Sequence, residues 1–400
     1  MTDRIVIVGA GQAGAALAAK LRALGFAGEV VMIGAEPVAP YQRPPLSKAY
    51  LLGQMGLDRL TLRAPEFWAD SRIDLRLGQP VTAIDPVARM VRIGDEALSY
   101  GQLALTTGAS PRRLPAAMGG DLGNVLCVRS LADADAMNPL FAPGARLVVI
   151  GGGYIGLEAA AVARKRGMDV TLVEAAPRIL GRVASAETAD LIRDLHLSHG
   201  VTIHEGVGLD RLLGDQVVTG VALADGRVID ADVVVVGIGV APDVDLAAQA
   251  GLGLDNGIAV DAQGRSSDPA IWAAGDCASF PWLTGRLRLE SVGNAIDMAE
   301  LVAANMLGAG LDYTPKPWFW SDQFDAKLQI AGLGAGADHW VVRRGEGASV
   351  WAYAAGRLVA VEALNGARAY MVGKRLIEAG RSPDPAAVAD TSVDLKALLA

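Results

Sequence analysis

Two copies of one glycine pattern constrain the fold of this chain more than any other feature of its sequence. The pattern G-x-G-x-x-G-x-x-x-A occurs at Gly9–Ala18 and again at Gly151–Ala160. Each copy follows a short apolar run and precedes an alanine-rich stretch, as expected for a buried parallel strand and a helix. In such a turn one glycine reverses the chain, one admits a pyrophosphate, and one lets helix and strand pack closely. The sequence therefore predicts two dinucleotide-binding units.

A carboxylate is expected about 20 residues after each glycine turn, where it meets a ribose hydroxyl. Glu36 follows the next apolar run after the first turn, and Glu174 ends the corresponding run after the second. A carboxylate accepts hydrogen bonds from a ribose 2′-OH and disfavours a 2′-phosphate. Glu174 therefore favours NADH over NADPH, although Arg178 and Arg182 lie close by and could weaken this preference.

Length, charge and apolar segments limit the class of protein. A chain of 400 residues is too long for one ordinary core, so two or three domains are expected. The net charge of −8 argues against a nucleic-acid partner. The most apolar segments, 147–163 and 233–240, are too short or too interrupted to span a membrane. The first strand begins too early to leave room for a signal peptide. We expect a cytoplasmic protein with no membrane and no nucleic-acid partner.

Cysteine and histidine form no recognisable metal or redox motif. Cys127 and Cys277 are far apart in the sequence, so neither a redox-active dithiol nor a cysteine zinc site is predicted. His196 and His199 lie beside an expected helix end at Gly200, where a surface or capping role is favoured. The sequence predicts no metal site.

Prolines and charges dominate the stretch after Glu36. Pro44 and Pro45 remove N–H donors and fix the backbone, which predicts a stiff connection leading into a helix near Ser47. Arg43 and Lys48 flank this piece. From composition alone, solvated surface charge explains them as well as a functional role does.

Two later segments contain further candidate functional residues. Asp276 ends an apolar strand, and ligands of open α/β sheets bind at such strand ends, although an aspartate there also commonly caps a helix. From Pro315 the pattern becomes alternating strands followed by a helix over 367–378, which predicts a small third domain. Trp318 and Trp320 share one face of a strand there. The alternative for the two tryptophans is packing between domains.

Together, the motifs resemble the putidaredoxin reductase-like, FAD-dependent ferredoxin reductases of oxygenase systems, whose wider clan has the glutathione reductase fold. The resemblance covers the whole chain. The glycine turns are generic to the clan, whereas R-P-P-L-S-K at 43–48 and W-S-D-Q at 320–323 are specific to this group. The implied fold is α/β, with two Rossmann-like dinucleotide-binding domains and a small α+β C-terminal domain. The implied domains are FAD-binding at 1–111 and 243–314, NAD-binding at 112–242, and C-terminal at 315–400.

The resemblance also implies FAD and NADH as cofactors. FAD would occupy the first turn, with Asp276 on its ribityl chain and Arg43 at its pyrophosphate, and NADH would occupy the second. Lys48 and Glu158 would lie beside the flavin N5 and the nicotinamide as an ion pair, and Trp320 against the flavin on the ferredoxin side. The expected catalytic residues are Lys48, Glu158 and Trp320. The expected cofactor-binding residues are Gly9, Gly11, Gln12, Ala13, Gly14, Glu36, Arg43, Lys48, Val81, Thr107, Gly108, Ala109, Gly151, Gly153, Tyr154, Ile155, Gly156, Glu158, Glu174, Gly239, Gly275, Asp276, Glu290, Val292 and Trp320.

The absence of a thiol near Lys48 separates this chain from other branches of the clan. Relatives that reduce disulfides carry a cysteine pair in the helix after the first turn, and the related oxidases and peroxidases carry one cysteine. Here the corresponding stretch is 44–48, which has none, so electrons would leave the flavin directly.

The implied function is hydride transfer from NADH to FAD, followed by single-electron transfer to a [2Fe–2S] ferredoxin. That ferredoxin is expected to be acidic and to feed a cytochrome P450 or a Rieske-type oxygenase. A docking face could include Trp320, Lys327, Lys374 and Arg375, and the protein is expected to be a monomer or weak dimer. The alternatives are an FAD-dependent NADH dehydrogenase or oxidase using quinone, oxygen or rubredoxin, and a non-catalytic NADH-sensing or scaffold protein.

Overall fold

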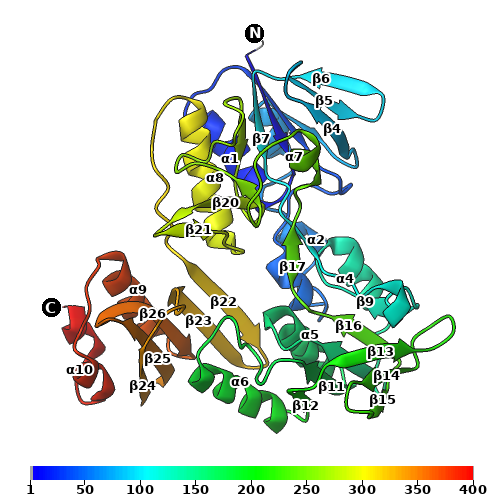
Figure 1. Ribbon diagram of the computed structural model, residues 1–400, viewed down its shortest axis with the longest axis vertical. Coiled ribbons are helices and arrows are strands. Elements are labelled where there is room, and N and C mark those ends of the chain that lie inside the picture. The colour runs from blue at the N-terminus through cyan, green and yellow to red at the C-terminus, as the bar shows by residue number, and fades with distance from the viewer. Residues whose placement is uncertain (1–2, 400) are drawn as a thin grey trace. The chain divides into compact units, whose positions relative to one another are not determined.

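The structure is a computed structural model that describes residues 3–399, and the chain forms two compact units. The first unit combines the residues up to Gln42 with Leu57–Ser110 and Ala241–Pro317. The second combines Arg43–Gly56, Pro111–Val240 and the residues from Trp318 onward. Figure 1 shows their elements along the chain. Each unit is built on its own parallel sheet.

A five-stranded parallel sheet forms the core of the first unit, in the order β19-β7-β1-β2-β3. Its apolar strands are covered on both faces, as continuous hydrophobic runs require. Helices α1 (Gln12–Ala23) and α8 (Val292–Met306) pack against each other, and their many alanines permit a close approach. The strands are β1 (Arg4–Val8), β2 (Glu29–Ile33), β3 (Ile73–Arg76), β7 (Gln102–Leu105) and β19 (Ile271–Ala273).

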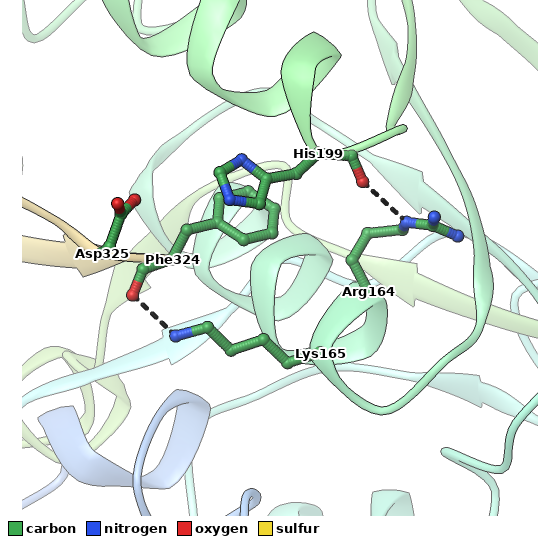
Figure 2. A pocket seen from close by; sticks show the side chains of 5 residues that line it. All are labelled: Arg164, Lys165, His199, Phe324 and Asp325. Atoms are coloured by element: carbon green, nitrogen blue, oxygen red, sulfur yellow. Dashed lines mark hydrogen bonds between the residues drawn. The ribbon is translucent and has the colours of Figure 1, made fainter.

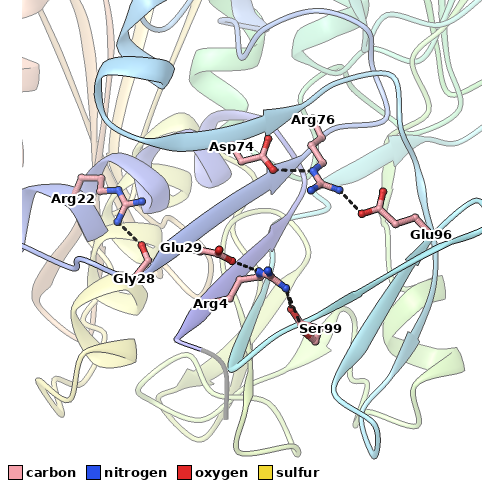
Figure 3. Close-up of polar contacts among 8 residues, drawn as sticks. All are labelled: Arg4, Arg22, Gly28, Glu29, Asp74, Arg76, Glu96 and Ser99. Atoms are coloured by element: carbon pink, nitrogen blue, oxygen red, sulfur yellow. Dashed lines mark hydrogen bonds and ion pairs between the residues drawn. The ribbon is translucent and has the colours of Figure 1, made fainter.

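Arginines tie a small antiparallel sheet, β4-β5-β6, to the parallel sheet of the first unit (Figure 3). Arg4 on β1 donates to the backbone and hydroxyl oxygens of Ser99, and Arg76 on β3 pairs with Glu96 at 2.9 Å. The remaining elements of this unit are β4 (Val81–Asp85), β5 (Met90–Ile93), β6 (Glu96–Ser99), β18 (Ile258–Ala259), β20 (Ala278–Trp282), β21 (Gly285–Leu287), α2 (Leu57–Leu60), α3 (Glu66–Asp70) and α7 (Asp245–Gln249).

A second five-stranded parallel sheet, in the order β12-β11-β10-β16-β9, forms the first part of the second unit. The helix α5 (Tyr154–Lys165) follows the second glycine turn and packs on this sheet. The other elements are β9 (Val125–Leu126), β10 (Arg146–Ile150), β11 (Asp169–Glu174), β12 (Thr202–Glu205), β13 (Leu209–Leu213), β14 (Gly220–Leu223), β15 (Val228–Asp230), β16 (Val233–Val236), α4 (Leu131–Met137) and α6 (Ala186–Ser198).

The C-terminal part of the second unit is an antiparallel sheet in the order β22-β23-β26-β25-β24, with a helix against it. The predicted change to alternating strands and the predicted helix over 367–378 are confirmed. The elements are β22 (Trp318–Gln323), β23 (Ala326–Gly332), β24 (His339–Gly345), β25 (Gly347–Ala354), β26 (Arg357–Leu364), α9 (Ala367–Glu378), α10 (Pro385–Ala389) and η3 (Leu395–Leu399).

The proline-rich stretch differs from the prediction. A short 3₁₀ helix, η1 (Pro44–Ser47), ends where a helix was expected to begin. The two prolines start this turn because their fixed φ suits its first positions. Lys48 then leaves helical geometry with φ −137° and ψ −110°. Short elements also occur at η2 (Ala116–Met118) and at the paired strands β8 (Ala109–Pro111) and β17 (Val240–Pro242).

The predicted sequence of strand, glycine turn, helix and strand is present twice, with β1-α1-β2 and β10-α5-β11 in parallel register. The α/β class and the C-terminal α+β part are confirmed. The boundaries of the three predicted domains stay a prediction. Between residues 3 and 399, no helix is both long and apolar enough to cross a bilayer.

Candidate functional site

The first and third glycines of each turn are required by the protein itself. Gly9 and Gly151 have φ of +115° and +105°, which only glycine adopts readily. A Cβ on Gly14 would lie 2.0 Å from the carbonyl oxygen of Gly9, and one on Gly156 would lie 2.2 Å from that of Gly151. Both turns are therefore built for close contact between helix and strand.

The second glycines, Gly11 and Gly153, are different. A Cβ at either position would meet no protein atom within 4 Å. Each is the N-cap of its helix and provides no side-chain cap, whereas serine side chains (Ser130, Ser185 and Ser291) cap α4, α6 and α8. Open space in front of uncapped N–H groups suits a pyrophosphate. The residues at both turns thus fit a dinucleotide.

The two predicted ribose carboxylates lie at or just after the second strand of each dinucleotide unit: Glu174 is the last residue of β11, and Glu36 follows β2 by three residues. The hydroxyl of Tyr41 donates to Glu36 at 2.6 Å. Glu174 accepts from the backbone N–H of Gly152 at 2.7 Å and of Ala176 at 2.6 Å. The Glu174 carboxylate is therefore fixed against the second glycine turn itself.

The two arginines near Glu174 are placed differently. The guanidinium of Arg178 donates to the carbonyl oxygens of Ala184 at 2.9 Å and Ser185 at 3.3 Å, so it braces its own loop. Arg182 is exposed and reaches within 3.4 Å of the Cβ position of Gly239.

The other candidates of the first unit cluster around α1 or lie at strand ends. A Cβ on Gly275 would lie 3.0 Å from that of Ala13, which places Asp276 beside the start of α1. The Thr107 hydroxyl donates to the Asp243 carbonyl oxygen at 2.6 Å. The remaining candidates are Val81 in β4, Gly108 with φ +79°, the buried Ala109, Glu290 in an ion pair with Arg288, and Val292 at the start of α8.

In the second unit, Lys48 and Glu158 form the expected ion pair, with 2.8 Å between Nζ and the carboxylate. Glu158 is 4% exposed and Lys48 16%, so the pair is largely shielded from water. Lys48 also donates to the Pro44 carbonyl oxygen at 3.2 Å. Arg43 donates to the carbonyl oxygen of Arg129 at 2.7 Å. The solvated-charge alternative is wrong for Lys48.

Glu158 has two further partners that sequence reasoning missed. The Ser47 hydroxyl donates to Oε2 at 2.7 Å, and the Ser321 hydroxyl donates to Oε1 at 2.6 Å. Behind Ser321 lie Gln323 and His196, joined by hydrogen bonds of 3.0 and 2.8 Å. The W-S-D-Q stretch contained two of these residues, but its sequence gave no indication of their partners.

The strand β22 presents aromatic rings on both faces. Trp318 and Trp320 stack on one face with ring centroids 5.3 Å apart, as their spacing predicts. Phe319 stacks on Tyr154, at the start of α5, with centroids 4.2 Å apart. All three residues from 318 to 320 are partly exposed, which disfavours simple core packing for the tryptophans. Ile155, the neighbour of Tyr154, is 38% exposed.

The prediction for the two histidines is right for one and wrong for the other. His199 is exposed and caps the end of α6. His196 is fully buried, because the face of α6 that carries it packs under β22 and contacts Gln323. Burial lowers the pKa of His196 from 6.5 to about 4, although the hydrogen bond from its ring to Gln323 opposes this shift.

His196 is therefore expected to make the protein acid-labile. Its folded pKa of about 4 lies below the unfolded value of 6.5, so the unfolded state binds more protons between these values. The contribution of the neutral His196 ring to the free energy of unfolding is fully present above pH 6.5 and is lost as the pH falls through about 4. Each pKa unit between the folded and unfolded values corresponds to 1.36 kcal/mol, so the free energy of unfolding falls by about 3 kcal/mol in total. Urea unfolding at pH 7 and pH 4 should show the wild type losing about 3 kcal/mol more stability than His196→Leu between the two pH values. An unchanged difference would contradict the assignment.

The two cysteines are buried and free. Burial raises the pKa of both Cys127 and Cys277, so both stay protonated and unreactive at neutral pH. Among residues 3–399, no group of three or more His, Cys, Asp or Glu side chains is arranged to hold a metal ion.

A surface pocket lies at the C-terminal end of α5, away from Gly153 (Figure 2). His199 stacks on Phe324, with centroids 3.9 Å apart. Lys165 donates to the Phe324 carbonyl oxygen at 2.6 Å, and Arg164 donates to that of His199 at 3.0 Å. Asp325 completes the lining. These contacts hold the turn that follows β22.

Comparison with known families gives two matches along the chain. Residues 3–299 match the family described as pyridine nucleotide-disulphide oxidoreductase. Residues 318–399 match the family described as reductase C-terminal. The second match coincides with the antiparallel sheet and its helices.

Relatives and solved structures match over nearly the full length. The chain is 43% identical to rhodocoxin reductase of Rhodococcus erythropolis, over 99% of this chain and 94% of that protein. It is 40% identical to putidaredoxin reductase of Pseudomonas putida, over 100% and 97%. It resembles the reductase in a covalent putidaredoxin reductase–putidaredoxin complex with a TM-score of 0.95 and 39% identity, covering 99% of this chain and 98% of that one. A ferredoxin reductase from Rhodopseudomonas palustris gives a TM-score of 0.96 and 41% identity, with both chains fully covered.

Proposed function

Because the chain belongs to the pyridine nucleotide-disulphide oxidoreductase family, among its putidaredoxin reductase-like ferredoxin reductases, we propose that it transfers electrons from NADH through FAD to a [2Fe–2S] ferredoxin. It is an FAD-dependent oxidoreductase.

The observation that carries the proposal is the shielded Lys48–Glu158 pair next to η1. A disulfide reductase of this family needs a reactive thiol to receive electrons. Here the two cysteines, Cys127 and Cys277, are buried, and burial raises the pKa of each thiol. A lysine that is paired with a carboxylate can stabilise negative charge, but it cannot accept electrons. The electrons must therefore pass to an external acceptor.

The first unit supplies the residues for FAD. The N–H groups at the start of α1 and the space at Gly11 would take the pyrophosphate, Glu36 the ribose, and Asp276 the ribityl chain. When bound, FAD accepts a hydride and releases electrons singly, which matches a two-electron donor to a one-electron acceptor. Gly14 and Gly275 keep α1 close to its neighbours, so that these groups stay in place.

The second unit supplies the residues for NADH and for its orientation. The start of α5 and Gly153 would take the pyrophosphate, and Glu174 the ribose hydroxyls. The Lys48 ammonium would stabilise negative charge as the hydride arrives, and Glu158 would hold that ammonium at its position. Tyr154 and Phe319 would shield the nicotinamide side from water.

We place the exit of electrons at the Trp318–Trp320 face of β22. Lys374 lies over Trp318 with 5.4 Å between Nζ and the ring centroid, and Arg375 is exposed next to it. Lys327 pairs with Asp322 at 3.8 Å, which reduces its share of a basic patch. An acidic ferredoxin would suit this face, and its association should slow as salt rises.

The remaining parts of the proposal follow the relatives. The ferredoxin would deliver electrons to a cytochrome P450 or a Rieske-type oxygenase, since one similar reductase is named for a CYP199A2 system and another for an anthranilate 1,2-dioxygenase system. We further propose a cytoplasmic monomer or weak dimer. Its FAD-binding domain would comprise 1–111 and 243–314, its NAD-binding domain 112–242, and its C-terminal domain 315–400.

Steady-state turnover with a set of acceptors tests the function. With NADH as donor and cytochrome c as reporter, cytochrome c reduction should require a [2Fe–2S] ferredoxin and should slow with added salt. Rubredoxin, a quinone and oxygen serve as the competing acceptors. Faster turnover with any of these than with every ferredoxin tested would replace the proposed acceptor.

Replacing Glu174 by serine should reduce the preference for NADH over NADPH. The wild type is expected to prefer NADH because the carboxylate sits at the turn where a 2′-phosphate would lie. Removing one repelling charge should lower the ratio of the two kcat/KM values about tenfold, a change of about 1.4 kcal/mol.

The matched control is Asp169→Ser, at the opposite end of the same strand β11. Asp169 is an exposed carboxylate, 78% accessible, and should leave the ratio unchanged. A Glu174→Ser enzyme with an unaltered ratio would show that another group sets the preference, and Arg182→Ser would then be the variant to measure.

A further inference from the structure

A row of buried hydrogen bonds runs from the Glu158 carboxylate into the second unit. Ser321 donates to Glu158 at 2.6 Å, Gln323 Nε2 donates to the Ser321 oxygen at 3.0 Å, and His196 Nε2 lies 2.8 Å from Gln323 Oε1. Ser321, Gln323 and His196 are at most 1% exposed. Every residue of the row is thus out of reach of bulk water.

The donors in this row all point the same way. Because the Gln323 amide donates to Ser321, its carbonyl oxygen faces His196 and must accept from Nε2–H. Because burial lowers the pKa of His196 to about 4, the ring is neutral at pH 7, and this hydrogen bond puts its one proton on Nε2. The proton on each donor is directed towards Glu158, so the row presents its last donor, the Ser321 hydroxyl, to the carboxylate.

The row carries a stability cost. Nδ1 of His196 is buried and has no hydrogen-bond partner among the described residues. Such an unsatisfied group costs roughly 1–3 kcal/mol, whereas an apolar side chain of similar size would avoid the cost. A role beyond filling the space under β22 would account for these polar groups.

The strand β22 gives the row a fixed register. Phe319, Ser321 and Gln323 alternate with the two tryptophans and face α5 and α6. The turn after Gln323 is held by Phe324, whose ring stacks on His199 (Figure 2) and meets His196 edge-on with centroids 5.0 Å apart. Gln323 is therefore held in place from both directions along the chain, by strand β22 before it and by Phe324 after it.

The two oxygens of Glu158 have different partners. Oε2 binds Lys48 and Ser47, whereas Oε1 binds Ser321. Without the bond at Oε1, the carboxylate can rotate about its last torsion, and the Lys48 ammonium moves with it. A displacement of about 1 Å at a reacting centre can cost on the order of 100-fold in rate.

We propose that Ser321 and Gln323, backed by His196, are positioning residues that orient Glu158 and thereby Lys48 for hydride transfer from NADH. This inference rests on the proposed function, because it assumes that the Lys48–Glu158 pair lies beside the reacting nicotinamide. It assigns the residues no direct contact with either cofactor.

Three variants test the proposal: Ser321→Ala, Gln323→Met and the double variant. Stopped-flow reduction of the FAD-loaded enzyme by NADH should slow about tenfold in Ser321→Ala and several-fold in Gln323→Met. KM for NADH should change less than kcat. Because the two residues act in series, the double variant should be no slower than Ser321→Ala, which independent structural defects would not produce.

A binding measurement provides a readout apart from activity. In Ser321→Ala, calorimetry should show altered affinity for NAD⁺ and unaltered affinity for ADP-ribose, which lacks the nicotinamide. The matched control is Ser349→Ala, because Ser349 is also buried in this sheet and accepts from Trp351 at 3.0 Å. It should leave reduction and both affinities unchanged.

The outcomes separate the two levels of the account. A wild type that NADH does not reduce would overturn the proposed function. A wild type that is reduced, with Ser321→Ala and Gln323→Met reduced equally fast, would overturn the positioning role alone. Should Ser321→Ala lose FAD or fold poorly, Gln323→Met decides, because it leaves the Ser321 hydroxyl in place.

Discussion

Replacing Gly153 by valine should raise the dissociation constant for NADH at least about 100-fold while FAD stays bound. The valine side chain would fill the space in front of α5 where the pyrophosphate approaches its N–H groups. Losing two charge-assisted hydrogen bonds costs roughly 3 kcal/mol or more, which corresponds to this factor. Titration of the FAD-loaded enzyme with NAD⁺ or ADP-ribose measures the change.

The fold should tolerate this substitution. Gly153 has φ −80° and no protein atom within 4 Å of its Cβ position, so valine meets neither strain nor a clash. Gly345→Val is the control, because Gly345 also has open space and lies at the end of β24. The same change at Gly11 should instead yield a protein that is purified without FAD. Full NADH affinity in Gly153→Val would place the dinucleotide elsewhere.

Replacing Lys48 by methionine should leave FAD bound and slow its reduction by NADH about 100-fold. Methionine keeps most of the length of the lysine side chain but removes the ammonium that neutralises the shielded Glu158 carboxylate. Two effects then add: negative charge arriving at the flavin loses its stabilising cation, and Glu158 loses one of its two partners at Oε2. Anaerobic stopped flow measures the rate directly.

Lys20→Met is the matched control for this variant. Lys20 forms a 3.0 Å ion pair with Glu300, but both side chains are substantially exposed at 34% and 44%. Exposed pairs contribute little, so this change should affect neither stability nor reduction noticeably. Reduction of Lys48→Met at the wild-type rate would remove the Lys48 ammonium from the mechanism.

Local sequence signals predicted the parts of the site that depend on local geometry. Gly14 and Gly156 are required by contacts within one strand–turn–helix segment, and Gly9 and Gly151 by their positive φ, so a short motif identifies all four. Glu174 ends the next strand and Glu36 follows the end of its own, at distances that the unit itself sets. The stacking of Trp318 on Trp320 follows from the two-residue period of a strand.

The missed parts depend on contacts between distant segments. Ser47 and Ser321 lie 111 and 163 residues from Glu158 in the sequence, and no periodicity links them. A surface or capping role was expected for His196 because it lies beside the predicted helix end at Gly200, but the contact of its ring with Gln323 on β22 decides that this ring is buried. The resemblance suggested the Lys48–Glu158 pair, but only the structure shows the serines that complete it.

Anaerobic electron transfer to a ferredoxin tests the central claim most directly. The enzyme is first reduced with NADH in the absence of oxygen, then mixed with an oxidised [2Fe–2S] ferredoxin, while flavin absorbance and the signal of the reduced cluster are followed together. The account predicts that the flavin band bleaches with NADH and returns as the cluster is reduced, with about two ferredoxins reduced per NADH. A bleached flavin that stays reduced with every [2Fe–2S] ferredoxin, yet reoxidises rapidly with a quinone or oxygen, would contradict it.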